Sequence, residues 1–219
     1  MKEKMLFWGI YSLDGKIATQ NLVPGNKVYG EKLIDFNGKE YRLWDPYRSK
    51  LCAAILKGLK TVEIKKNSKV LYIGAATGTT ASHVSDIVGE KGEVYCVEIS
   101  ERNFRELMKQ CETRHNMLPM LQDARNVDII GGETGIVDVI YQDVSTRDQA
   151  AILVSNAKLL KTNGFAYVAI KSQSISVAKK PSEVYAEFLK EISQAFEVIE
   201  KIDIAPFDLM HLFVVLKKK

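Results

Sequence analysis

A glycine-containing turn followed by two hydroxyl side chains is the segment of this sequence best suited to binding a cofactor. The apolar run Lys69-Val-Leu-Tyr-Ile73 leads into Gly74 and Gly78, and Thr79-Thr80 follow. The glycines let the backbone approach a ligand, because they carry no Cβ and tolerate φ values that other residues avoid. The threonine hydroxyls lie where a helix would begin, beside N–H groups that lack partners. This pattern predicts a ligand-binding turn, and an ordinary strand-to-helix turn is the alternative.

A carboxylate further along the chain narrows the class of cofactor. The run Gly92-Glu-Val-Tyr-Cys-Val-Glu98 resembles a second strand that ends in an acid, at about the separation at which nucleotide-binding units place a ribose-gripping carboxylate. A dinucleotide fingerprint needs glycine where Ala76 stands, and a P-loop needs a lysine that Gly78-Thr79-Thr80 lacks. S-adenosyl-L-methionine carries no phosphate, so both absences are compatible with it.

Polar residues follow the other expected strands and could surround a reaction centre. Asp123 follows the third strand, Asp143 the fourth and Lys171 the fifth. Because ligands of open α/β sheets lie at the carboxyl ends of the strands, these side chains are expected at one edge. A desolvated Lys171 near a second cation, Lys50, would have a pKa lowered towards that of a general base, with Asp143 orienting the ammonium groups. A purely structural aspartate–lysine pair is the alternative, and the lone His211 is by itself typical of a satisfied core residue.

The elements that must position these residues alternate along most of the chain. Strands are predicted at 69–73, 93–98, 118–122, 137–142, 164–170, 196–203 and 211–216. Helices are predicted at 79–88, 101–115, 147–160 and 181–195. This alternation predicts an α/β fold with a mainly parallel sheet and helices on both faces. The short connection 204–210 favours an antiparallel final pair, and a seven-stranded mixed sheet of this kind is the class I S-adenosylmethionine-dependent methyltransferase fold.

The first part of the chain has a different pattern. Residues 1–48 contain short apolar runs separated by turn signals such as Asp14-Gly15 and Asn37-Gly38, which predict a small N-terminal antiparallel β domain. Residues 49–65 have helical apolar spacing with Ser49 as a cap, so that Lys50 opens this helix. The methyltransferase domain is therefore predicted to span 49–219.

Composition excludes several classes of protein. The three cysteines form no C-x-x-C pair, which argues against a zinc site or a disulfide framework and favours a reducing compartment. No apolar run approaches the length that crosses a bilayer. The net charge of +4 permits a polyanionic partner without demanding one.

Four segments together resemble the fibrillarin family, the ribose 2'-O-methyltransferases of box C/D guide ribonucleoproteins. They are Tyr41-Arg-Leu-Trp-Asp-Pro-Tyr-Arg-Ser-Lys-Leu51, Val70-Leu-Tyr-Ile-Gly-Ala-Ala-Thr-Gly-Thr-Thr80, Ser82-His-Val-Ser-Asp-Ile-Val-Gly89 and Tyr95-Cys-Val-Glu98. The match extends over essentially the whole chain. The glycine- and arginine-rich extension typical of eukaryotic members is absent, so the chain looks like the compact archaeal form, and this resemblance implies a cytoplasmic location.

The resemblance implies a cofactor and a set of site residues. It implies that S-adenosyl-L-methionine is held by Gly74, Ala75, Thr79, Thr80, Glu98, Ile99, Asp123, Ala124, Asp143, Val144, Ser145 and Thr146. It implies a catalytic group of Lys50, Asp143, Lys171 and His211. Two segments depart from the family pattern: Asp143-Val-Ser-Thr146 stands where the family usually has Asp-Val-Ala-Gln, and Met210 stands where an aspartate is more usual.

The resemblance also implies partners and a division of labour. They are a box C/D guide RNA, its target rRNA with tRNA as a further substrate class, a Nop-domain scaffold protein and a kink-turn-binding protein of ribosomal type. Base pairing would select the target, while Lys171 helps to remove or polarise the proton of the ribose 2'-hydroxyl. Two rivals remain: a methyltransferase of the same fold that acts on protein or a small molecule, and a non-catalytic subunit of the particle.

Overall fold

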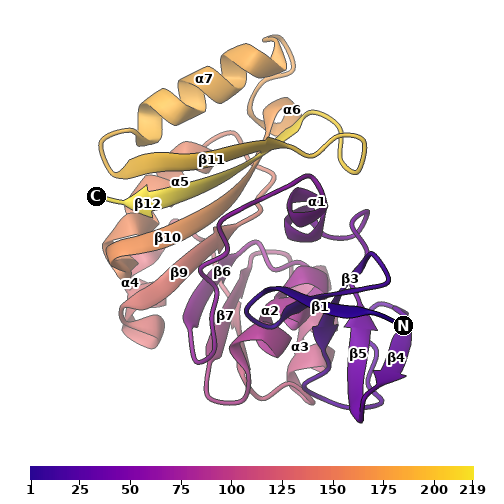
Figure 1. The fold of residues 1–219 in the computed structure, drawn as a ribbon. Coiled ribbons are helices and arrows are strands. Elements are labelled where there is room, and N and C mark those ends of the chain that lie inside the picture. Colours follow the sequence, from indigo (N-terminus) through magenta and orange to yellow (C-terminus); the bar gives the residue numbers. More distant parts are fainter.

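The computed structural model describes residues 1–219, which form two β-sheets (Figure 1). The first sheet is antiparallel, with five strands in the order β1-β2-β3-β5-β4. The strands are β1 (Glu3–Phe7), β2 (Ile10–Leu13), β3 (Lys16–Gln20), β4 (Leu33–Phe36) and β5 (Lys39–Leu43). Two of its hairpins turn at Asp14-Gly15 and Asn37-Gly38, where all four residues have positive φ. The antiparallel sheet predicted for the start of the chain is confirmed.

The second sheet has seven strands in the order β11-β12-β10-β9-β6-β7-β8. The strands are β6 (Lys69–Ile73), β7 (Glu93–Glu98), β8 (Met117–Leu121), β9 (Val137–Gln142), β10 (Leu160–Lys171), β11 (Phe196–Asp203) and β12 (His211–Lys218). Strand β12 lies between β10 and β11 and is antiparallel to both, while the pairs from β10 to β8 are parallel. This arrangement confirms the predicted mixed sheet.

Apolar residues on both faces of the large sheet explain its sandwich of helices. Alternate side chains of a strand point to opposite faces, so Val70 and Tyr72 of β6 enter one core and Leu71 and Ile73 enter the other. The first core is covered by α1 (Lys50–Leu56), α2 (Thr79–Val88) and α3 (Glu101–Cys111). The second is covered by α4 (Val127–Thr134), α5 (Gln149–Asn156) and α7 (Pro181–Ile192). Two short elements, η1 (Ala157–Leu159) and α6 (Ser172–Ile175), complete the chain.

Some predicted element boundaries are wrong. The helix predicted over 49–65 ends at Leu56, because Gly58 adopts a φ of +96° and the chain then runs extended towards β6. Val62 and Ile64 are buried in this extended segment, which explains their apolar character without a helix. Helix α4 was not predicted, since its sequence contains Gly131-Gly132 and glycine disfavours helix interiors. The helices predicted to end at 115 and 195 end at Cys111 and Ile192.

A buried charge cluster joins the N-terminal sheet to α2. The Asp86 carboxylate accepts hydrogen bonds from Arg42 Nη1 at 2.9 Å and from Arg114 Nη1 at 2.6 Å. Arg42 also pairs with Glu31 at 2.6 Å, so the four charges balance. All four side chains are almost fully buried. Because an unpaired buried charge is costly, this cluster fixes the N-terminal sheet against the helix that follows the glycine turn.

No helix of this chain is both long and apolar enough to traverse a lipid bilayer.

Candidate functional site

The ends of β6, β7 and β9 meet tightly at the glycine turn. Gly74 has a φ of +83°, and a Cβ built there would overlap the backbone carbonyl of Asp143. The Gly74 N–H donates to the carbonyl of Val97 at 2.9 Å, and the Asp143 N–H donates to that of Ile73 at 2.9 Å. A residue with a side chain at position 74 would therefore push the two strand ends apart. The glycine is required by this close approach as well as by its φ value.

Glu98 closes the turn on the β7 side. Its carboxylate accepts hydrogen bonds from the backbone N–H groups of Ala76 and Ser100, each at 2.8 Å. The residue is only 6% exposed. A carboxylate can accept about four hydrogen bonds, so further acceptor positions remain for the hydroxyls of a ribose.

A cavity of about 390 Å³ opens between these strand ends. It is bounded by the ends of β6, β7, β8, β9 and β10 and by the residues that follow them. The residues that line it are Ile73, Gly74, Ala76, Val97, Glu98, Ile99, Asn103, Gln122, Asp123, Ala124, Arg125, Asp143, Val144, Ser145, Thr146, Ile152 and Lys171. Carboxylates, backbone groups and apolar side chains thus share one hollow at the carboxyl edge of the sheet, where ligands of open α/β folds bind.

Arg125 connects two segments at the rim of this cavity. Its guanidinium binds both oxygens of Asp123, at 3.1 and 3.0 Å, and both oxygens of Asp148, at 2.8 Å each. It also donates to Thr146 Oγ1 at 3.2 Å. Hydrogen bonds from Arg125 and Thr146 lower the pKa of Asp148 to about 2. The bidentate contacts align the residues after β8 with those after β9.

The residues predicted to do chemistry gather beside the cavity around Asp143. Its Oδ2 atom lies 3.1 Å from Lys50 Nζ, and its Oδ1 atom lies 3.0 Å from Lys171 Nζ. Lys50 Nζ also donates a hydrogen bond to Asp143 Oδ2. The ion pair with Lys171 includes no hydrogen bond, because Asp143 Oδ1 has no hydrogen-bond partner. Burial raises the pKa of Asp143, but the charges of Lys50 and Lys171 outweigh it and hold the pKa below its usual value. Asp143 is therefore an anion between two cations.

The lysines come from different elements. Lys50 is the first residue of α1, where Ser49 Oγ caps the helix by accepting from the Cys52 N–H at 3.4 Å. Lys50 also pairs with Asp208 at 3.4 Å. Burial lowers the pKa of Lys50, but Asp143 and Asp208 raise it above the usual value, so its ammonium persists at neutral pH. Lys171 ends β10, where its Nζ donates to Ser145 Oγ at 2.7 Å.

Sheet register brings His211 to the same cluster. In the antiparallel pair of β10 and β12, Lys171 lies directly opposite His211. His211 Nδ1 lies 2.8 Å from the Leu209 carbonyl and 2.9 Å from Asp208 Oδ1. Both partners are acceptors, which assigns the proton of the neutral ring to Nδ1 and the lone pair to Nε2. Nε2 has no partner. The pKa of His211 lies below its usual value, because the lowering by burial outweighs the opposing effects of the hydrogen bond to Leu209 and the charge of Asp208.

Most of the predicted site residues meet at this edge of the sheet. Three of the residues named for the cofactor, Ala75, Thr79 and Thr80, lie outside the cavity lining. Thr80 is buried and donates to Ser49 Oγ at 3.0 Å, which ties the glycine turn to the start of α1. Contact of these three residues with a cofactor stays a prediction.

Three residues of the site were missed from the sequence. Asp208 contacts both Lys50 and His211, and Arg125 bridges the cavity rim. Gln149 is fully buried and exchanges hydrogen bonds with the backbone of Lys171 at 3.2 and 3.4 Å. The spacing Asp208-x-x-His211 was the available signal for the first, whereas nothing local marks the other two.

No group of three or more His, Cys, Asp or Glu side chains is arranged to hold a metal ion. The polar groups at this edge are lysine ammonium groups, the Arg125 guanidinium, carboxylates, the Ser145 and Thr146 hydroxyls and one imidazole.

Comparison with known proteins gives concordant matches over the full length. The family model described as Fibrillarin matches residues 1–219. A fibrillarin-like rRNA/tRNA 2'-O-methyltransferase of Thermococcus onnurineus is 50% identical, with 99% of this chain and 98% of that protein covered. A structure of Aeropyrum pernix fibrillarin in complex with natively bound S-adenosyl-L-methionine is 42% identical with a TM-score of 0.91, covering 99% of this chain and 98% of that one. A chain of a fibrillarin/Nop5p complex is 36% identical with a TM-score of 0.89, covering 99% and 100%.

Proposed function

This chain belongs to the fibrillarin family, and on that premise we propose that it is an S-adenosyl-L-methionine-dependent RNA ribose 2'-O-methyltransferase. The observation that carries the proposal is the convergence of Lys50, Asp143, Lys171 and His211 beside the cavity at the carboxyl edge of the sheet. A methyltransferase acting on a hydroxyl needs the acceptor oxygen held against the methyl donor, and this cluster brings donors and an acceptor together beside the cavity, which Asp143 and Lys171 line.

The cavity fits the adenosyl cofactor by the chemistry of its lining. We propose that Glu98 binds the ribose hydroxyls and that Asp123 faces the adenine amino group, with Ala124 leaving room for the ring. Ile99 and Val144 supply apolar contact, and the 143–146 turn bounds the opposite side. When bound, the cofactor supplies an electrophilic methyl group on a sulfonium. The remaining chemistry belongs to the side chains at the rim.

Lys171 is proposed to hold the 2'-oxygen of the ribose. An ammonium group has three N–H donors. One of them donates to Ser145 Oγ, and the ammonium group lies 3.0 Å from Asp143 Oδ1 in an ion pair without a hydrogen bond, so N–H donors remain for a substrate oxygen. Asp143 fixes Lys171 and Lys50 together, so the nucleophile would meet a preorganised group. Positioning of this kind can account for a large share of the acceleration.

His211 is proposed to accept the proton of the hydroxyl. In this structure Lys171 acts as a hydrogen-bond donor and Asp143 is committed to two cations, whereas His211 Nε2 is buried and without a partner. The pKa of His211 is lowered, so the ring is neutral and basic at pH 7. A neutral imidazole is suited to general base catalysis at that pH.

We further propose that target choice lies with a box C/D guide RNA. The net charge of +4 suits contacts with an RNA backbone more than readout of a sequence. The similar chain in a fibrillarin/Nop5p complex supports a Nop-domain scaffold protein as a partner. A kink-turn-binding protein of ribosomal type would complete the particle. The N-terminal sheet, proposed as a domain over 1–48, is available for such contacts.

The test is methyl transfer from radiolabelled S-adenosyl-L-methionine to a guide-paired RNA. We expect label on the RNA with the target 2'-hydroxyl and none on the RNA with a 2'-deoxy sugar at that nucleotide. Labelling of both RNAs would contradict the ribose assignment, and labelling of a protein component instead would favour a protein methyltransferase. Failure of the folded chain to bind the cofactor by calorimetry would favour a non-catalytic subunit.

A further inference from the structure

An exposed aromatic side chain lies next to the catalytic cluster and has no role in it. Tyr47 is 67% exposed and belongs to the turn that immediately precedes α1. Lys50, which pairs with Asp143, follows three residues later. Three residues of extended chain span at most about 11 Å, so the Tyr47 backbone is fixed close to the reaction centre.

Tyr47 is held in place without being covered. Its ring packs edge-to-face on Phe207, with 5.2 Å between ring centroids and an interplanar angle of 70°. Phe207 precedes Asp208, which contacts both Lys50 and His211. The aromatic pair therefore joins the two segments that border the cluster. A fixed and exposed aromatic ring of this kind is typical of platforms on which nucleobases stack.

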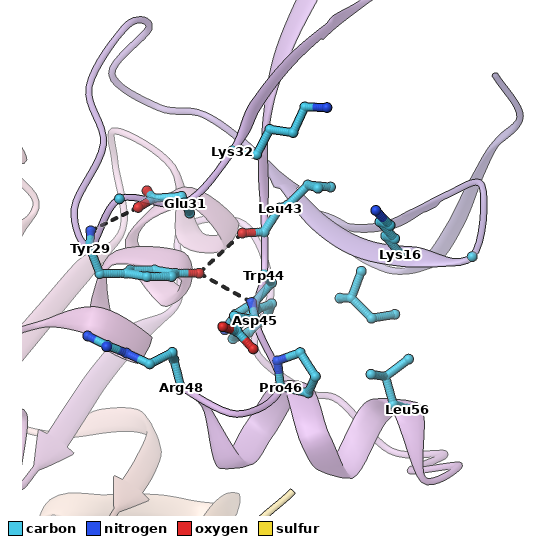
Figure 2. A pocket seen from close by; sticks show the side chains of 13 residues that line it. Lys16, Tyr29, Glu31, Lys32, Leu43, Trp44, Asp45, Pro46, Arg48 and Leu56 are labelled. Atoms are coloured by element: carbon cyan, nitrogen blue, oxygen red, sulfur yellow. Dashed lines mark hydrogen bonds between the residues drawn. The ribbon is translucent and has the colours of Figure 1, made fainter.

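The next residue, Arg48, presents a cation on the other side of the turn. Its guanidinium carbon lies 5.7 Å from the centre of the Tyr29 ring, and Figure 2 shows it below that ring. The side chain is exposed and makes no hydrogen bond or ion pair within the chain. Its five N–H donors are therefore available to a ligand, and a guanidinium fits a phosphate in bidentate fashion.

The cavity beside Arg48 has a surplus of positive charge. It measures about 520 Å³, and Lys16 and Lys32 also line it (Figure 2). Neither lysine forms an ion pair. Of the two carboxylates in the lining, Glu31 is already neutralised by Arg42, which leaves Asp45 alone against three cations. Such a surface attracts the phosphates of a nucleic acid.

We propose that Tyr47 stacks on a base of the RNA strand that carries the target ribose, and that Arg48 binds a phosphate of the same strand. This inference rests on the proposed function and adds the path of the substrate. An RNA strand suits this surface better than a protein does. Tyr47 can stack on a base and the adjacent Arg48 can bind a phosphate, and both lie beside Lys50 and Lys171, which are proposed to face the target ribose. The turn before α1 then aligns the RNA with Lys50 and Lys171.

Tyr47 is tested by equilibrium binding of the full chain to a guide-paired RNA whose target nucleotide carries the fluorescent base 2-aminopurine. Because a stacked base is worth about 1–3 kcal/mol, Tyr47→Ala should weaken binding by about 5- to 150-fold and reduce quenching of the probe. Tyr47→Phe keeps the ring and should bind within about twofold of the unchanged protein. The matched control is Trp8→Ala. Trp8 is also an exposed aromatic residue, and its neighbour Gly9 packs against Ile87 near the C-terminal end of α2.

Arg48 is tested by the salt dependence of the same binding. Each phosphate contact contributes about 0.7–0.9 to the slope of log K against log salt, so Arg48→Gln should reduce that slope by this amount. Tyr47→Ala should leave the slope unchanged, because stacking releases no counterion. Lys66→Gln is the control, since it removes one exposed charge in the turn before β6, at the opposite edge of the sheet.

Tyr47→Ala with unchanged affinity and quenching, in a particle that still methylates the target ribose, would overturn the stacking proposal and leave the proposed function intact. The same variant losing its association with the Nop-domain scaffold protein, with unchanged RNA affinity, would assign Tyr47 to a protein interface and also overturn it. An unchanged protein that transfers no methyl to the 2'-hydroxyl would instead defeat the proposed function.

Discussion

Replacement of Asp86 by alanine should be the most destabilising change in the junction between the N-terminal sheet and α2. The carboxylate has no exposed surface and receives four hydrogen bonds, from Thr19, Leu22, Arg42 and Arg114. Asp86→Ala leaves two buried guanidinium groups with only Glu31 as a countercharge. Breaking a buried pair in this way costs about 3–5 kcal/mol. That is a large part of the total stability of about 5–15 kcal/mol of a typical domain.

Thermal and urea unfolding of the purified chain, followed by circular dichroism, measure this loss. For a chain of this size about 2–4 °C is lost per kcal/mol, so the Tm should fall by roughly 6–20 °C. Asp128→Ala is the control, because its carboxylate is 95% exposed and pairs only with Lys158. That change should alter stability by about 0.5 kcal/mol or less. Equal losses in the two variants would refute the idea that the buried cluster holds the N-terminal sheet on α2. A second change, Arg114→Leu, added to Asp86→Ala should recover part of the stability, since it removes a cation left unpaired.

Three further predictions concern the site. Gly74→Ala should lower both stability and cofactor affinity, because Gly74 has a φ of +83° and a Cβ there would overlap the Asp143 carbonyl. The control Gly132→Ala lies in α4, where a Cβ would have no neighbour within 4 Å, and should be neutral or stabilising by about 0.5–1 kcal/mol. Calorimetry measures cofactor affinity and thermal unfolding measures stability for both variants. The single-turnover rate should be flat above pH 6.5 and fall at lower pH, since the competent ring of His211 is neutral and its pKa is lowered; a His211→Gln variant that keeps the rate and the pH profile of the unchanged protein would exclude His211 as the base. Asp143→Asn keeps the shape but removes the anion between Lys50 and Lys171, so the rate should fall by about 100- to 1,000-fold, and an unchanged rate would show that the ion pairs do not position the lysines.

The sequence predicted the parts of the fold that depend on local patterns. The seven strands from Lys69 onward follow from apolar runs separated by helical spacing, and the short 204–210 connection indicated the antiparallel last pair. Asp14-Gly15 and Asn37-Gly38 revealed two hairpins, because tight turns of this kind need positive φ at both residues. Sequence patterns gave the wrong element where tertiary packing decides between a helix and an extended chain. The extended segment containing Val62 and Ile64 has apolar spacing that also suits a helix, and only burial against the large sheet selects the extended form.

The site was predictable only as far as strand ends reveal it. Asp143 directly follows β9 and Lys171 ends β10, so sheet order brings them together. Lys50 and His211 looked structural by themselves, and the family resemblance singled them out before the register of β10 against β12 placed His211 opposite Lys171. The unusual Met210 left open how that histidine is oriented, and Asp208 supplies the carboxylate through a contact that depends on the path of the loop.

If the cluster around Asp143 is the reaction centre, Lys171→Ala should slow single-turnover methyl transfer in a reconstituted particle. The rate should fall by about 100-fold or more, with cofactor affinity retained. Lys161→Ala, which removes a lysine at the other end of β10 that pairs with Asp138, should leave the rate unchanged. Transfer by Lys171→Ala at the rate of the unchanged protein would show that the reaction centre lies elsewhere.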